Sequence, residues 1–186
     1  LGIRFRDLIP FYIEKIKSNP KLKLRMLHFF IDSGIKDSAY YWSELNKCLN
    51  MFVELKKICP TLANINIGGG LPIRNSLGSN FDYAYVIEEI VNKIKTFCDD
   101  ADLEHPNIYT EFGSYTVGES GANIFEIIGQ KKQNDSELWY MINGSLMTTV
   151  PDVWGLGQRF ILLPINLWGQ GYQRTIIGGL SCDVSD

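Results

Sequence analysis

The chain has 186 residues, which is enough for one hydrophobic core or for one domain with part of a second. Its hydrophobic content of 45% and its charged content of 21% are typical of a soluble globular protein. The net charge of -3 and the lack of a basic patch argue against nucleic-acid binding. No apolar run in the sequence approaches the roughly 20 residues that a membrane span needs, so no membrane association is expected.

The cysteines show neither a CxxC spacing nor a neighbouring histidine, which argues against zinc and against a disulfide framework. They are Cys48, Cys59, Cys98 and Cys182. A reducing cytoplasm is therefore the expected location. The first three fall on or beside apolar helical faces and are predicted to be core residues.

The first part of the chain alternates between helical and strand-like hydrophobic patterns. In chain order we predict a helix over 7–17, a strand over 22–31, a helix over 38–58, a strand over 64–67, a helix over 81–99 and a strand over 107–112. Alternation of this kind favours a parallel sheet with right-handed crossovers. An open doubly wound sheet and a slice of a (β/α)8 barrel both fit.

Three consecutive glycines, Gly68, Gly69 and Gly70, follow the second predicted strand directly. Glycines at the end of a buried strand leave main-chain N–H groups uncovered, so a phosphate can approach them closely. A plain tight turn explains the same residues about equally well.

After Gly113 the helical period disappears and short β-rich runs follow. These runs cover residues 122–128, 138–142, 160–165 and 175–180, with a polar loop over 131–135. We predict an antiparallel β domain there, with the first domain over 1–115 and the second over 116–186.

In either α/β architecture the functional site lies at the carboxyl ends of the strands. The residues at these ends include Phe30, Ser33, the three glycines, Glu111 and Gly113. A carboxylate such as Glu111 at the end of a buried strand needs a donor or a cation nearby. A capped loop N–H or a surface ion pair is the simpler alternative for it.

Four segments in order resemble the pyridoxal-phosphate-dependent decarboxylases of the ornithine, diaminopimelate and arginine group, whose barrel fold is shared with alanine racemase. The segments are 27–33 (LHFFIDS), 68–70 (GGG), 111–114 (EFGS) and 179–183 (GLSCD). Within this group the chain is most similar to the biosynthetic arginine decarboxylases. The resemblance implies a partial (β/α)8 barrel that binds pyridoxal phosphate, followed by part of an antiparallel β domain.

The resemblance also implies roles for individual residues. Glu111 would keep the ring nitrogen of the cofactor protonated through a charge-assisted hydrogen bond. The remaining cofactor contacts would come from Gly68, Gly69, Gly70, Gly113, Ser33 and Phe30. The family usually has a histidine at the position of Phe30, and we expect Phe30 to stack on the ring instead. The family also usually has an arginine at the position of Ser114. Arg74 is one candidate for the missing positive charge.

Cys182 and Asp183 match a pair that, in the family, reaches into the active site of a partner subunit. The resemblance therefore implies a homodimer or higher homo-oligomer of the full-length protein. Asp183 would meet the cationic end of a basic amino-acid substrate, and Cys182 would protonate the carbanion. Without the resemblance, a buried thiol followed by a turn aspartate is the simpler interpretation.

The implied reaction is decarboxylation of arginine to agmatine and CO2 in polyamine biosynthesis. The family's Schiff-base lysine lies on an earlier strand, so we expect the chain to be an internal fragment that is inactive alone. Full-length enzymes of this kind can also use Mg2+. Diaminopimelate or carboxynorspermidine as substrate stays open, as does a decarboxylase-like protein that binds a partner without catalysis.

Overall fold

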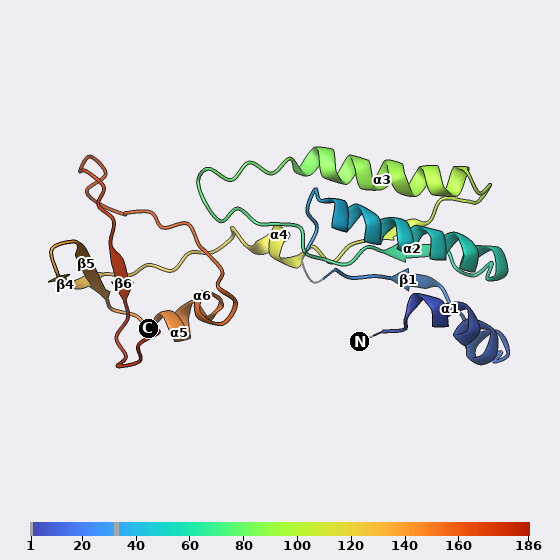
Figure 1. Cartoon of the computed structure of the whole chain (residues 1–186), viewed down its shortest axis with the longest axis horizontal. Coiled ribbons are helices and arrows are strands. Elements are labelled where there is room, and N and C mark those ends of the chain that lie inside the picture. The colour runs from blue at the N-terminus through green and yellow to red at the C-terminus, as the bar shows by residue number, and fades with distance from the viewer. Residues whose placement is uncertain (1, 32–33) are drawn as a thin grey trace. The chain divides into compact units, whose positions relative to one another are not determined.

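The computed structural model describes residues 2–31 and 34–186 of the chain (Figure 1). These residues form two compact units. The first unit extends to Ile73 and resumes at Asn80–Gly118, and the second contains Arg74–Ser79 and Glu119–Asp186.

A parallel sheet forms the centre of the first unit. Its strands are β1 (Met26–His28), β2 (Asn64–Asn66) and β3 (Asn107–Tyr109), in the order β1-β2-β3. Both neighbouring pairs are parallel, which confirms the predicted α/β arrangement. Each strand is shorter than its predicted range of 22–31, 64–67 or 107–112.

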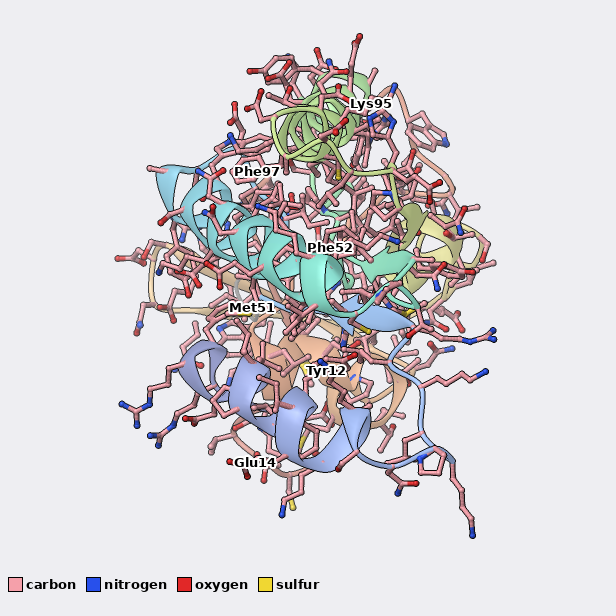
Figure 2. The ribbon with its side chains drawn as sticks, turned by 90° about the vertical axis from the view of Figure 1, so that its right-hand side faces the viewer. Tyr12, Glu14, Met51, Phe52, Lys95 and Phe97 are labelled. Atoms are coloured by element: carbon pink, nitrogen blue, oxygen red, sulfur yellow. The ribbon has the colours of Figure 1, made fainter. Side chains whose placement is uncertain are left out.

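The helices of the first unit match the predicted ranges closely, except that the short α4 was not predicted. They are α1 (Phe5–Phe11), the π-helical turn η1 (Tyr12–Lys17), α2 (Ala39–Ile58), α3 (Tyr83–Asp99) and the short α4 (Gly113–Val117). Helix α2 begins where the Ser38 hydroxyl accepts a hydrogen bond from Tyr41 N, and α3 begins with the equivalent bond from Tyr85 N to Asp82. Figure 2 shows α2 between α3 and the α1–η1 segment, and Tyr12 OH donates to the Ile58 carbonyl across that contact.

The two faces of the parallel sheet differ in character because side chains alternate along a strand. Leu27, Ile65 and Ile108 occupy the same register position and belong to the core. Helical core residues join them, namely Tyr41, Leu45, Cys48, Leu49, Phe52, Leu55, Val86, Ile90, Ile94 and Cys98. The next register position, with His28 and Asn66, lies on the opposite, polar face.

Three of the cysteines are buried, as the sequence predicted. Cys48, Cys59 and Cys98 are part of the core cluster, whereas Cys182 is exposed. Burial raises the pKa of Cys48 to about 12, so this thiol stays protonated.

The second unit contains a mixed sheet of β4 (Ile127–Gln133), β5 (Glu137–Ile142) and β6 (Ile176–Gly178). The β4–β5 pair is antiparallel, as predicted, but β6 pairs with β5 in parallel. Residues 131–133 belong to β4, so the predicted polar loop is confined to its last part. The predicted strand over 160–165 is wrong, and two short helices, α5 (Leu146–Thr149) and α6 (Pro151–Leu156), were not predicted.

None of the helices in the described ranges is long and apolar enough to cross a membrane.

Candidate active site

The carboxyl ends of the three parallel strands bring several predicted site residues together. Phe30 follows β1, the glycine triplet follows β2, and Glu111 follows β3. The main-chain N–H of Glu111 donates to the Gly68 carbonyl at 2.9 Å, which ties the loop after β3 to the glycine turn. The acid and the glycines are therefore neighbours at one edge of the parallel sheet, as the sequence predicted.

Each of the three glycines approaches a different neighbour so closely that a side chain would not fit. A Cβ on Gly68 would lie 2.7 Å from the Phe29 carbonyl oxygen, and one on Gly69 would lie 2.5 Å from the Glu111 carbonyl oxygen. A Cβ on Gly70 would lie 2.6 Å from the Cα of Gly34. Gly68 and Gly70 also have φ angles of 72° and 92°, in the region that glycine adopts readily.

The N–H groups of the glycine turn are not equivalent. The N–H of Gly68 donates to the side-chain oxygen of Asn66 at 2.8 Å. Within residues 2–31 and 34–186, by contrast, no hydrogen-bond acceptor is found for the N–H of Gly69 or of Gly70. These two donors, uncovered by side chains, fit an anion such as a phosphate group.

The Glu111 carboxylate lies on the polar side of the sheet and is held by two side chains. Asn66 Nδ2 donates to Glu111 Oε1 at 2.9 Å, and His28 Nε2 lies 3.5 Å from the same oxygen. The side chains of His28 and Glu111 are 47% and 52% exposed. The carboxylate is therefore oriented by the protein and still open to a ligand.

Sequence reasoning assigned no role to Asn66 or His28. The available signal was a polar residue at alternate positions of otherwise apolar strands, since Asn64 and Asn66 must face the same side of β2. The parallel register then sets His28 beside Asn66.

The other residues predicted to bind the cofactor lie close to this turn or outside the described ranges. Phe30 is 58% exposed, and its ring passes 3.3 Å from where a Cβ of Gly68 would be. Gly113 begins α4, and its N–H donates to the Glu111 carbonyl at 2.9 Å, so this N–H already has a partner. Ser33 lies outside the described residues.

Ser114 supplies no positive charge, and Arg74, the candidate for the missing charge, belongs to the other unit of the chain. Ser114 lies in α4, and Arg74 belongs to the second unit, where its Nε is 4.0 Å from Glu119 Oε1. No group of three or more His, Cys, Asp or Glu residues in the described part of the chain is placed to hold a metal ion.

Cys182 and Asp183 lie in a turn of the second unit, and both are exposed. Asp183 Oδ1 accepts from Ser185 N at 2.8 Å, and Asp186 Oδ2 accepts from Ser181 N at 2.9 Å. Hydrogen bonds from Ser181, its hydroxyl first, lower the pKa of Asp186 to about 2. The aspartate at the end of the turn therefore stays ionised and holds the turn closed.

The fold and the site define an α/β protein segment that offers main-chain donors to a phosphate and an acid beside them. Residues 2–118 match the family described as "Pyridoxal-dependent decarboxylase, pyridoxal binding domain". The chain belongs to this family, and its cofactor is pyridoxal 5'-phosphate. The uncovered N–H groups of Gly69 and Gly70 and the Glu111 carboxylate fit the phosphate and the ring nitrogen of this cofactor.

Curated relatives of the chain include biosynthetic arginine decarboxylases from several bacteria. The enzyme of Prochlorococcus marinus (strain MIT 9215) is 26% identical over 182 residues, which cover 90% of this chain and 28% of the relative. That of Geotalea uraniireducens (strain Rf4) is 31% identical over 141 residues, covering 72% of this chain and 22% of the relative. The chain thus spans about a quarter of the length of these relatives.

Solved structures of decarboxylases share the fold. The biosynthetic arginine decarboxylase of Campylobacter jejuni has a TM-score of 0.79 at 18% identity, covering 99% of this chain and 46% of the other. The diaminopimelate decarboxylase of Helicobacter pylori also has a TM-score of 0.79 at 18% identity, covering 100% of this chain and 44% of the other. The lysine decarboxylase of Selenomonas ruminantium reaches 0.69 at 22% identity, covering 99% of this chain and 47% of the other.

Proposed function

We propose that the complete protein carrying this chain is a decarboxylase that converts arginine to agmatine and CO2. The observation that carries the proposal is the Glu111 carboxylate, held beside the glycine turn at the carboxyl edge of the parallel sheet. We propose arginine as the substrate, rather than another amino acid, because the curated relatives at 25–31% identity are arginine decarboxylases.

Pyridoxal phosphate, when bound, supplies a protonated ring that accepts the electron pair left on the α-carbon as CO2 departs. In the proposed site Glu111 keeps the proton on the ring nitrogen, because a carboxylate stabilises an adjacent N–H cation. Gly69 and Gly70 bind the phosphate through their main-chain N–H groups. Phe30 packs on a face of the ring and excludes water from it.

The remaining proposed steps belong to residues of the second unit. Asp183 receives the guanidinium group of the substrate, since a carboxylate can accept two parallel hydrogen bonds from it. Cys182 donates the proton that replaces CO2 on the α-carbon. In this proposal both residues act in the site of a partner subunit, so the active protein is a homo-oligomer. We also propose a location in the cytoplasm, on the basis of the cysteine pattern.

The test is an assay of the complete protein with pyridoxal phosphate and carboxyl-labelled amino acids. Release of labelled CO2 is expected from arginine, and at a rate at least tenfold lower from lysine, ornithine and diaminopimelate. Glu111→Gln should reduce release from arginine by at least a hundredfold, because a neutral amide does not stabilise a ring cation. Faster release from another amino acid would overturn the choice of substrate, and unchanged activity of Glu111→Gln would overturn the role of the acid.

Residues 1–186 alone are proposed to be inactive, because the family's Schiff-base lysine is expected on an earlier strand. A CO2-release assay of this segment checks the point, with the complete protein as the positive control. Turnover by the segment would show that a lysine within it is sufficient.

A binding protein without catalysis is the second candidate, and Phe30 and Ser114 favour it because the family usually has a histidine and an arginine there. This candidate predicts a complete protein that binds a partner and releases no CO2 from any amino acid. Cofactor binding with turnover would eliminate it.

A further inference from the structure

Asn66 connects the glycine turn to the acid through both ends of its amide. Its Oδ1 accepts from Gly68 N at 2.8 Å, and its Nδ2 donates to Glu111 Oε1 at 2.9 Å. The main chain closes the ring, because Glu111 N donates to the Gly68 carbonyl at 2.9 Å. Asn66, Gly68 and Glu111 therefore form a closed hydrogen-bonded ring across the ends of β2 and β3.

The amide at position 66 satisfies both partners at once, because its oxygen accepts and its nitrogen donates. A main-chain N–H needs an acceptor, and an ionised carboxylate needs a donor, so the two contacts also fix which way the amide faces. Aspartate would keep the acceptor and lose the donor. An aliphatic side chain would lose both.

The backbone of Asn66 is itself fixed. Its carbonyl accepts from Phe29 N at 3.1 Å, and the following residue, Ile67, donates to the Tyr109 carbonyl at 3.0 Å. Asn66 thus sits in the middle strand of the sheet with hydrogen bonds to both neighbours, and its side chain has a rigid base. His28, 3.5 Å from the same carboxylate oxygen, is a weaker second contact.

We propose that Asn66 is a positioning residue, which fixes the Glu111 carboxylate relative to the glycine turn so that the acid meets the ring nitrogen while the turn holds the phosphate. This inference rests on the proposed function of the site. It goes beyond that function by naming the side chain that sets the spacing between the two ends of the cofactor site. Asn66 acts through Glu111 and Gly68 and is not itself a catalytic residue.

The test compares Asn66→Asp with Asn64→Asp in the complete protein. Asn64 lies on the same face of the same strand, accepts from Asn107 Nδ2 at 3.0 Å and donates to the Arg25 carbonyl at 2.8 Å. Both substitutions replace an amide, which donates and accepts, with a carboxylate, which only accepts. Both therefore add a negative charge, but only the charge at position 66 lies beside Glu111. The measurements are the dissociation constant of pyridoxal phosphate and the 15N chemical shift of its labelled ring nitrogen.

Asn66→Asp is expected to weaken cofactor binding about tenfold, as loss of one hydrogen bond to a charged group at a half-exposed site does. The ring-nitrogen signal is expected to change, whereas Asn64→Asp should bind within about twofold of the unaltered protein and keep its signal. Asn66→Ser, which is neutral and smaller, should move both readouts in the same direction as Asn66→Asp. His28→Gln should have a smaller effect than either, because its contact is longer.

Unchanged binding and an unchanged ring-nitrogen signal in folded Asn66→Asp and Asn66→Ser would overturn the inference and leave the proposed function intact. An equal loss in Asn64→Asp would also overturn it, because the effect would then belong to the sheet face as a whole. Absence of cofactor binding by the unaltered protein would instead refute the proposed function, and the inference with it.

Discussion

The close packing of the glycine turn makes a graded prediction for alanine substitutions. Gly69→Ala places a Cβ 2.5 Å from the Glu111 carbonyl oxygen, which is a main-chain atom held in place by the N–H of Gly113. Overpacking of this kind destabilises the folded state by about 1–3 kcal/mol. Alanine also lowers the conformational entropy of the unfolded chain, which offsets roughly 0.4–1 kcal/mol of this loss. We therefore expect the free energy of unfolding to fall by about 1–2 kcal/mol.

Gly70→Ala combines a contact with an unfavourable backbone conformation. Its Cβ would lie 2.6 Å from the Cα of Gly34, and the φ angle of 92° is in the left-handed region. The conformation adds roughly 1–2 kcal/mol, so the total loss is expected to be about 2–4 kcal/mol. Gly113→Ala is the control, because no atom lies within 4 Å of the added Cβ and its φ angle is not positive.

Denaturant unfolding of the complete protein without cofactor measures the three free energies. The expected order of stability is Gly113→Ala at or above the unaltered protein, then Gly69→Ala, then Gly70→Ala. If Gly69→Ala is as stable as Gly113→Ala, the close approach of the turn to Glu111 does not exist in solution, and the geometry of the candidate site is wrong.

Further predictions concern the second unit, the cysteines and a helix cap. Hydrogen bonds led by the Ser181 hydroxyl lower the pKa of Asp186 to about 2. The closed turn is therefore stable above about pH 4 and opens as the pH falls through that pKa. Amide hydrogen exchange of Ser181 should become faster over this range, and Asp186→Asn should abolish the pH dependence. A thiol reagent should label the exposed Cys182 in the folded protein, and the buried Cys48 only after unfolding. Mass spectrometry of the labelled peptides measures this. Prompt labelling of Cys48 in the folded protein would contradict the core described above. Asp82→Ala should lower the free energy of unfolding by about 1 kcal/mol, since it removes the N-terminal cap of α3, and an unaltered denaturation midpoint would argue against that cap.

The α/β part of the fold could be predicted because its signals are local. The apolar stripe of 38–58 and the proline that follows it fix α2 to within a residue, and the glycines mark the end of β2. In the second unit the hydrophobic pattern was a poor guide, because the pairing between strands determines which residues form the sheet. Residues 160–165 are apolar, yet Leu162 and Ile165 are exposed and no strand pairs with them, whereas Lys131 and Lys132 pair with β5 despite their charge.

The candidate site was predicted only in part, and for a physical reason. Glu111 and the glycines stand at strand ends, which a sequence shows directly. The link through Asn66 depends on strand register and on which face of β2 its side chain occupies, and these become definite only when the strands pair. The resemblance implies roles for single residues, whereas the hydrogen bonds that join them form only when the chain folds.

The pairing of β2 with β3 also protects the amide of Asn66 against deamidation. Asparagine deamidates when the main-chain nitrogen of the next residue attacks the side-chain carbonyl carbon and ammonia leaves. Here that nitrogen belongs to Ile67, and its hydrogen is engaged with the Tyr109 carbonyl at 3.0 Å. Spontaneous conversion of Asn66 to aspartate is therefore slow while β2 and β3 stay paired.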